Sequence, residues 1–367
     1  MNLFGYYKLT KPKEYASDWV YIIDNAIRQA NRKVCLILGI RRCCLTKDAC
    51  LTFSDLEVIG LHLFEKNTEI DEFLALAIAK TGVPVQICSD EGPDIMPSIR
   101  RTQKTHPTIK HVPDITHKVS NLLKKMLDKC SKWNRFIERL NKSKNRLKQS
   151  KLFYLSPPNI RGKSRFMNAH GAVEWALKTL AMLDKLKPGD NNRDEILEKL
   201  GWLTKSRKAV EGFADLFRLG ELAKGYFRES HIAHNGWKEL QTKLHAQAVT
   251  DQGMVLAAAI SAYAMEQCAK VCEGPLMLGC SEIIESAYGK LKNLDRECGN
   301  SGFTSSVIGL AACFGKTELA TVQAAFESSR PVDVDDWISA NVGDTPLRLR
   351  RAHLKSSVRP LKCHKRQ

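Results

Sequence analysis

Carboxylates at widely separated places in the sequence could form a metal site if the fold brings them together. Asp24 ends the apolar stretch YIID, and Asp90 ends QICSD shortly before a glycine that permits a sharp turn. Two carboxylates held close together repel each other unless a cation neutralises them. Their oxygens favour a hard ion such as Mg²⁺. The pair therefore predicts a divalent-metal site, although an acid at a strand end can also simply cap the next turn.

A third acid lies late in the chain, in the stretch LGCSEIIESAYGKLK at 278–292. Glu282 and Glu285 are three residues apart, so they are neighbours on one face of a helix, where like charges repel mildly. One of them could complete a site for two ions that activates water and stabilises the departing oxygen of a phosphodiester. Lys290 and Lys292 follow within two turns, so the same helix could also hold a phosphate backbone.

The elements that must position these acids begin with a set of short apolar runs. A helical pattern ending at a glycine predicts a helix over 69–82. Apolar runs predict strands at 19–24, 33–42, 56–66, 83–92 and from 108 onward. Three antiparallel strands, followed by parallel additions around a crossover helix, predict an α/β fold with a mixed sheet.

From 117 to about 275 the pattern is helical throughout. It is broken at 156–165, at 186–192 and near Gly201. A large all-α insertion into the α/β fold is the simplest explanation, with the fold completed by a helix at 280–293 and further C-terminal helices. The predicted parts are a core with five strands (1–118), the insertion (119–275), the last part of the core (276–346) and a disordered basic tail (347–367).

Positive charge is concentrated in two blocks and predicts a polyanionic partner. The net charge is +17, and residues 96–165 hold 19 Lys or Arg against three acids. The last 21 residues, 347–367, hold eight basic residues and no acid. Because each neutralised phosphate releases bound counterions, such blocks favour nucleic acid; the alternative is a solvated basic helix and a frayed tail. In 122–151 we predict that an apolar stripe is core: Met126, Trp133, Phe136, Ile137 and Leu140.

Several classes of protein are disfavoured by the composition. No run of about 18 apolar residues is present, so no membrane span is expected. The N-terminus lacks the apolar region of a signal peptide, which predicts a cytoplasmic protein whose cysteines are free thiols. A zinc site using the adjacent Cys43 and Cys44, or Cys268 and Cys272, is a weaker alternative.

Four motifs in a fixed order resemble a known family: YIIDNAI, ICSDEGPDI, DITHKVSNLLKKML and SEIIESAYGKLK. Together they resemble bacterial insertion-sequence DDE transposases, which have a ribonuclease H-like catalytic domain. The layout is similar to that of the Mutator-like and hAT-like groups, which carry a helical insertion. The resemblance covers residues 5–355. It implies metal-dependent DNA strand cleavage and strand transfer, with two Mg²⁺ (or Mn²⁺) ions.

The resemblance also implies roles for individual residues. Asp24, Asp90 and Glu285 would be the catalytic metal ligands, with Asp94 and Glu282 as the alternatives for the last two. In the family's D-x-x-H motif, Asp114 and His117 would be a structural pair near the site, with His117 donating to a phosphate or to Asp114. Asp114 can equally cap the helix that follows it.

Double-stranded DNA is the expected partner, both as element ends and as target, with a homodimer on the DNA and a place near the bacterial nucleoid. Arg100, Arg101 and Lys104 follow the Asp90 turn, so we expect them near the cut phosphate. The other expected contacts are His117, Lys118, Lys124, Lys125, Lys290 and Lys292. Trp237 is an option for stacking on a flipped base, although a core role is more usual for a tryptophan in such helices.

One feature of the family is not recognisable in this chain. Members usually carry an upstream helix-turn-helix that reads the element's terminal repeats, and the first predicted catalytic strand begins only at residue 19. The expectation is a truncated copy, a misassigned start, or recognition of the ends by another surface. A catalytically inactive, DNA-binding remnant or regulator is therefore the main alternative, and a structure-selective nuclease or resolvase a further one.

Overall fold

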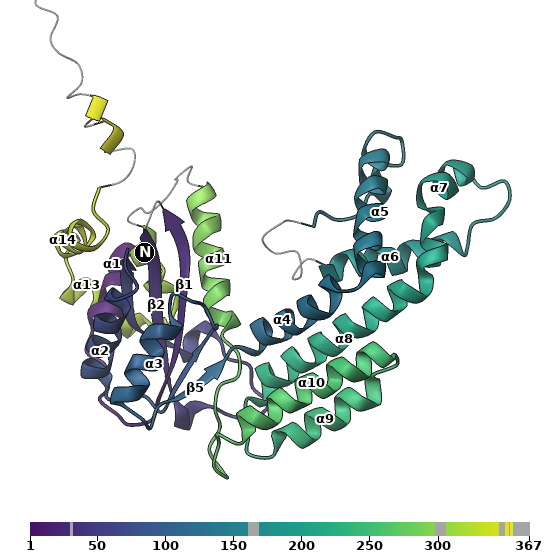
Figure 1. Ribbon diagram of the computed structural model, residues 1–367. Coiled ribbons are helices and arrows are strands. Elements are labelled where there is room, and N and C mark those ends of the chain that lie inside the picture. Colours follow the sequence, from purple (N-terminus) through teal and green to yellow (C-terminus); the bar gives the residue numbers. More distant parts are fainter. Residues whose placement is uncertain (30–31, 161–168, 298–305, 345–348, 352, 355–367) are drawn as a thin grey trace, which may run out of the picture. The chain divides into compact units, whose positions relative to one another are not determined.

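The computed structural model describes residues 1–29, 32–160, 169–297, 306–344, 349–351 and 353–354 (Figure 1). By its internal contacts the chain divides into two compact units. Unit 1 comprises Met1–Asp114 with Cys280–Gln367, and unit 2 comprises Ile115–Gly279. These divisions fall near the predicted boundaries at 118 and 275. The predicted tail at 347–367 lies mostly outside the described residues.

A five-stranded mixed sheet forms the centre of unit 1. The strands are β1 (Trp19–Gln29), β2 (Arg32–Arg41), β3 (Glu57–Phe64), β4 (Gln86–Ser89) and β5 (Lys110–Pro113). Their order is β3-β2-β1-β4-β5, with β1, β2 and β3 antiparallel and β4 and β5 parallel to β1. This order and these directions are those of the ribonuclease H-like fold. The predicted fold class is confirmed.

The first strand is longer than its apolar sequence indicates. Asp24 was predicted to end the strand, but β1 continues to Gln29 and Asp24 lies opposite Leu36 in the ladder with β2. The residues after Asp24, Asn25 to Gln29, stay extended because β2 continues alongside them and offers backbone hydrogen-bond partners. Asp24 is therefore held within the ladder with β2, one residue past the last pair of β1 with β4, instead of standing at the end of its strand.

Helices α2 (Glu69–Thr81) and α3 (Met96–Thr105) cover one face of the sheet. Tyr21 and Ile23 of β1, Ile87 of β4, and α2 and α3 side chains such as Leu74 and Ile99 belong to one buried cluster. Because side chains alternate along a strand, the odd-numbered residues of β1 and β4 point into this cluster. The even-numbered residues point to the opposite face.

The C-terminal part of unit 1 is tied to its N-terminal part. Its helices are α11 (Glu282–Glu297), α12 (Ser306–Gly309), α13 (Leu319–Ser328) and α14 (Pro331–Asn341). Helix α1 (Asn2–Thr10) was not predicted, and its buried Lys8 ammonium donates to the carbonyls of Phe314 at 2.6 Å and Gly315 at 2.9 Å. Arg32 of β2 donates to the carbonyls of Asn341 and Val342. The N-terminal helix is thus an integral part of this unit.

Unit 2 is helical, as the sequence pattern indicates. Its helices are α4 (Ile115–Asp128), α5 (Ser131–Lys148), α6 (Ala169–Leu183), α7 (Arg193–Leu200), α8 (Arg207–Ser230), α9 (Gly236–Gln247) and α10 (Asp251–Cys268). Of the stripe predicted to be core, Trp133, Phe136 and Leu140 are buried. Trp133 meets Phe213 of α8 edge to face, with ring centroids 4.9 Å apart. The amphipathic helix therefore packs through its aromatic side and exposes its charges.

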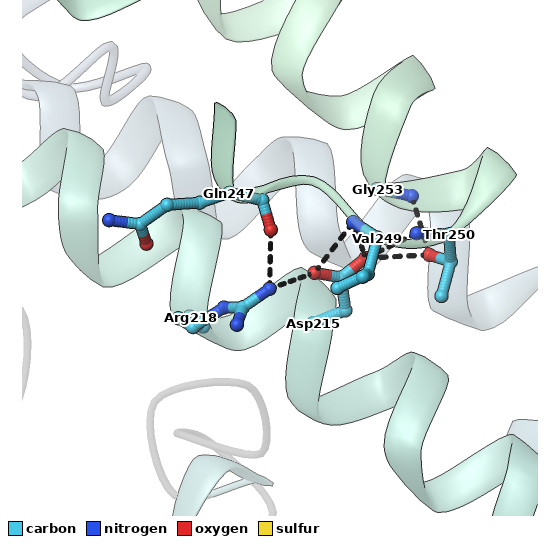
Figure 2. Close-up of polar contacts among 6 residues, drawn as sticks. All are labelled: Asp215, Arg218, Gln247, Val249, Thr250 and Gly253. Carbon is cyan, nitrogen blue, oxygen red and sulfur yellow. Dashed lines mark hydrogen bonds and ion pairs between the residues drawn. The ribbon is translucent and has the colours of Figure 1, made fainter. Parts of the chain in front are cut away.

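A buried carboxylate fixes the start of α10 in this unit (Figure 2). Asp215, 3% exposed, accepts the Thr250 backbone N–H at 2.9 Å and the Thr250 hydroxyl at 2.7 Å. Arg218 neutralises it at 2.6 Å and also donates to the carbonyl of Gln247. The Thr250 Oγ1 in turn accepts from the N–H of Gly253, as an N-cap does. The paired and fully hydrogen-bonded charge joins α8 to the loop between α9 and α10.

In the part of the chain that the structure describes, no helix is both long enough and apolar enough to cross a membrane. The cysteines described in this part are free thiols.

Candidate active site

The strand register places Asp24 and Asp90 next to each other. In the parallel pair of β1 and β4, Ile23 lies opposite Ser89, and each acid is the next residue along its chain. Because Ile23 and Ile87 point into the α2 and α3 cluster, Asp24 and Asp90 belong to the opposite face if the alternation continues past the end of β4. The two carboxylates thus start from neighbouring positions on the same side of the sheet.

Short local hydrogen bonds orient both acids. The Asn25 backbone N–H donates to Asp24 Oδ1 at 2.7 Å. Asp90 Oδ1 accepts the N–H of Gly92 at 3.1 Å, which closes the turn after β4. A Cβ atom at position 92 would stand 2.8 Å from that same oxygen, so any larger residue here would displace the Asp90 carboxylate. Both carboxylates are half-buried.

Helix α11, which carries Glu282 and Glu285, packs against β1 (Figure 1). The buried Tyr288 hydroxyl donates to the backbone carbonyl of Asp24 at 3.0 Å. Burial and the nearby Asp24 charge raise the pKa of Tyr288 well above its usual range, so the phenol keeps its proton. Glu285 lies almost one turn before Tyr288 on the same helix. It is therefore close along the helix to the residue that touches Asp24.

The direction of the two glutamates around α11 differs. Ile284, Tyr288 and Leu291 are buried and mark the inner side of the helix. At about 100° per residue, Glu285 points about 60° away from Tyr288, and Glu282 about 120° away. This geometry favours Glu285 as the acid that faces the sheet. Both acids also lie in the first turn, where carboxylates stabilise the end of a helix.

Asp114 holds the start of α11 through hydrogen bonds to Ser281. Its Oδ2 accepts both the backbone N–H and the hydroxyl of Ser281, the latter at 2.7 Å. Its own backbone N–H donates to the carbonyl of Ser89 at 2.9 Å, so it is tied to β4 as well. Asp114 is 1% exposed. The end of β5 and the beginning of α11 are thus fixed to each other by one buried carboxylate.

Asp94, the alternative to Asp90, is engaged elsewhere. Its carboxylate forms an ion pair with Lys33 of β2. Lys33 and Cys35 are two residues apart on β2, so their side chains point to the same face of the sheet. Cys35 belongs to the buried cluster under α2 and α3. The pair therefore lies on the face of the sheet away from Asp24, which favours Asp90.

The donor set suits a hard divalent cation, since every candidate ligand is a carboxylate oxygen. Among the described residues, however, no three His, Cys, Asp or Glu side chains already form a cluster that could hold a metal ion. The backbone brings Asp24 and Asp90 to adjacent positions and α11 to the same strand. Their side chains would have to turn toward a common point to share a cation.

The basic residues expected near the acids lie at several different places. Arg100, Arg101 and Lys104 are on α3, which packs on the face of the sheet that holds Tyr21, Ile23 and Ile87. Arg101 is also engaged by Asp71, with both contacts between 2.9 and 3.0 Å. The reason is that the chain turns back across the sheet directly after Asp90.

The remaining predicted contacts are distributed over α4 and α11. Lys124 and Lys125 are exposed on α4. Lys118 lies over the Tyr263 ring at 5.3 Å, and Lys290 lies over the Phe53 ring at 3.9 Å. His117 of α4 is half-buried, and Lys292 of α11 is exposed. The proposed base-stacking residue Trp237 is half-buried, with Lys238 5.9 Å from its ring.

Two residues that shape the site were not predicted. Ser281 stands directly before α11, and its type is a common helix N-cap that the sequence could have revealed. Tyr288 reads as an ordinary apolar-side residue of α11, and only the fold shows that its hydroxyl reaches Asp24.

No protein-family model and no curated protein matches the sequence. Among solved structures, one similar to this chain is a Drosophila P element transposase strand transfer complex, with 9% identity, a TM-score of 0.37, and coverage of 89% of this chain and 81% of that one. Two forms of the HTLV-2 integrase catalytic core domain in complex with magnesium, dimeric and trimeric, match with 18% identity each. Their TM-scores are 0.19 and 0.18, over 41% and 42% of this chain and 93% and 94% of theirs. The assignment of the fold rests on the strand order and register of the sheet.

Proposed function

We propose that this chain is a metal-dependent DNA strand transferase of the DDE transposase class. The observation that supports the proposal is the register of β1 and β4 in a ribonuclease H-like sheet: Ile23 lies opposite Ser89, and Asp24 and Asp90 are the next residues along the two chains. Glu285, on the helix whose Tyr288 contacts Asp24, is the proposed third acid. The DNA would be held by the exposed lysines and arginines, which are concentrated in 96–165.

The chain's own residues prepare this site in defined ways. Tyr288 and the β2 ladder hold the backbone of Asp24, and the Gly92 N–H orients Asp90. Asp114 and Ser281 fix the start of the helix that carries Glu285. When bound, two Mg²⁺ or Mn²⁺ ions would supply the activated water or hydroxyl and the charge that stabilises the departing oxygen. Asp24, Asp90 and Glu285 would hold them.

The proposal is tested by metal-dependent nicking and joining of plasmid DNA with the full chain. Asp24→Asn and Asp90→Asn should lower the rate by more than about 100-fold, as expected when a group that stabilises the transition state is lost. Glu91→Gln is the matched control, because it removes the same charge from the exposed neighbour of Asp90. Full activity in Asp24→Asn would refute the site.

A DNA-binding protein without catalysis is the second candidate. It is favoured by one observation: within the described residues, the acids are not already gathered into a metal-binding cluster. The same assays separate the two functions. A catalytic chain shows cleavage that requires Mg²⁺ or Mn²⁺, whereas a binding-only chain retains DNA in the presence of either ion and leaves it intact.

A further inference from the structure

Two large aromatic side chains stand exposed on unit 2, directly after the basic helix α5. Phe153 and Tyr154 belong to the short 3₁₀ helix η3 (Phe153–Leu155), and each is 65% exposed. Their ring centroids are 6.1 Å apart and their planes are nearly perpendicular, at 86°. Most exposed apolar residues of a soluble protein stand singly. An adjacent pair of exposed rings therefore marks a candidate interaction site.

The backbone beneath these rings is well anchored. Leu152, the residue before them, is completely buried. The Trp175 indole of α6 donates to the carbonyl of Leu155 at 3.0 Å. The Phe153 N–H donates to the carbonyl of Ser150 at 3.2 Å, which continues the turns from the end of α5. The rings are thus held outward by packed structure on both sides.

Basic residues precede the pair along the chain, although two of them, Arg146 and Lys151, contact acids of α7, Glu198 and Glu195. Between Ser131 and Leu155 the chain has eight Lys or Arg residues and one acid, Glu138. Lys148 is exposed and has no ion-pair partner among the described residues, and burial together with the Lys148 charge lowers the pKa of Lys144. Lys151 is 3.7 Å from Glu195 and remains 67% exposed. Rings and cations together would attract a partner that is both flat and anionic.

We propose that Phe153 and Tyr154 form a stacking platform for unpaired bases of single-stranded DNA, with Lys148 and Lys151 contacting the phosphates. Every base has a flat face that can stack on an aromatic ring, and such platforms pair aromatic rings with a basic track. Bases inside a duplex are covered by their neighbours, so single strands fit better than duplex DNA. This inference rests on the proposed nucleic-acid function, and it does not depend on the acids of the sheet.

The test measures binding of the full chain to a fluorescein-labelled oligothymidylate and to a labelled duplex, by anisotropy and in EDTA. Replacing Phe153 and Tyr154 together by Ala should weaken single-strand binding by about tenfold or more. Duplex binding should change by less than about twofold, because phosphate contacts persist. Replacing both by Trp should restore single-strand binding. The melting temperature should stay unchanged, since both rings are exposed.

The matched control is Tyr15→Ala, which removes an aromatic ring that is 75% exposed in unit 1 and should leave both affinities unaltered. Equal losses on single strands and duplex, or no loss on either, overturn the platform; in the latter case the rings serve a protein partner. If the Ala variant shows no selective loss of single-strand binding while the parent chain cleaves DNA with metal, this inference alone is refuted. Platform binding without any cleavage refutes the proposed catalysis alone.

Discussion

At the scale of single residues, the choice between the glutamates of α11 depends on a difference in direction around one helix. Glu285 points closer to the buried side than Glu282, and only Glu285 lies within one turn of Tyr288. We expect Glu285→Gln to lower metal-dependent DNA cleavage by more than about 100-fold. Glu282→Gln removes the same charge from the same turn and should cost less than about fivefold. The reverse ranking would assign the site to Glu282.

His231 predicts a pH dependence of stability in unit 2. It is 1% exposed, and neither ring nitrogen has a hydrogen-bond partner among the described residues. Burial lowers the pKa of His231 below its usual value of about 6.5, so the unfolded chain takes up the proton more readily. Stability should therefore be complete above about pH 6.5 and should fall as the pH decreases below it.

Thermal unfolding at a series of pH values from 7.5 to 5.5 tests the role of His231. Its backbone, at φ 55° and ψ −157°, lies in a region that glycine adopts easily, so His231→Gly introduces no new backbone strain. This variant should show a smaller fall in melting temperature on acidification than the parent. The exposed His245→Gln should keep the full fall. Some fall in melting temperature on acidification should remain in His231→Gly, because burial also lowers the pKa of His62.

At the scale of elements, the position of α11 depends on the contact between Asp114 and Ser281. Asp114→Ala would leave the backbone N–H of Ser281 without its acceptor and should destabilise the protein by about 1–3 kcal/mol. Ser281→Ala removes only the hydroxyl and should cost less. Because the two side chains interact directly, the double mutant should lose less stability than the two single mutants lose together. Strict additivity in denaturant unfolding would show that the contact does not hold the helix.

The start of α10 offers a paired test with two glycines. At Gly253 a Cβ atom would collide with Asp215 Oδ2, so Gly253→Ala should destabilise the protein by about 1–3 kcal/mol. Gly212 lies inside α8 with nothing near its Cβ position, and Gly212→Ala should stabilise by up to about 1 kcal/mol. The two melting temperatures should shift in opposite directions. A neutral Gly253→Ala would mean that the Asp215 contacts are not essential.

Much of the fold could be predicted from sequence because apolar runs and helical spacing directly reflect burial. The five strands, the mixed sheet and the long helical segment followed from such patterns. The extension of β1 did not, because the residues after Asp24 mix polar and apolar types and are kept extended by pairing with β2. Helix α1 was missed because its anchor, the buried Lys8, reads as a surface residue. The placement of α3 was also missed, since closeness in sequence to Asp90 does not reveal a turn back across the sheet.

At the scale of the whole molecule, the contacts within unit 2 predict that it can fold alone. Its ends are already together, because the Ile115 N–H donates to the carbonyl of Gly279 at 3.1 Å. Its helices bury their own aromatic core around Trp133 and Phe213. We expect residues 115–279, expressed separately, to be helical by circular dichroism and to unfold cooperatively. A gradual, non-cooperative melt would show that this unit needs the rest of the chain.

If the full chain binds DNA as proposed, its affinity should depend on the salt concentration. If exposed lysines and arginines such as Lys124 and Lys125 contact phosphates, affinity should fall steeply as salt increases. Replacing these two by Gln should reduce the slope of log affinity against log salt by about 2, since each phosphate contact contributes about 0.9. Lys66→Gln with Lys80→Gln, both exposed in unit 1, is the charge-matched control. An unchanged slope in the α4 variant would exclude α4 from the interface.

The chain passes from unit 1 into unit 2 at Asp114–Ile115 and returns at Gly279–Cys280, and this arrangement has an evolutionary consequence. Asp114 binds Ser281 on the sheet side, and Ile115 binds Gly279 on the helical side, so departure and return occur at the same point. A single in-frame exchange of DNA between these positions could replace the entire helical segment with a different one. The ancestral sheet and its acids would be inherited unchanged, while descendants acquire new binding surfaces.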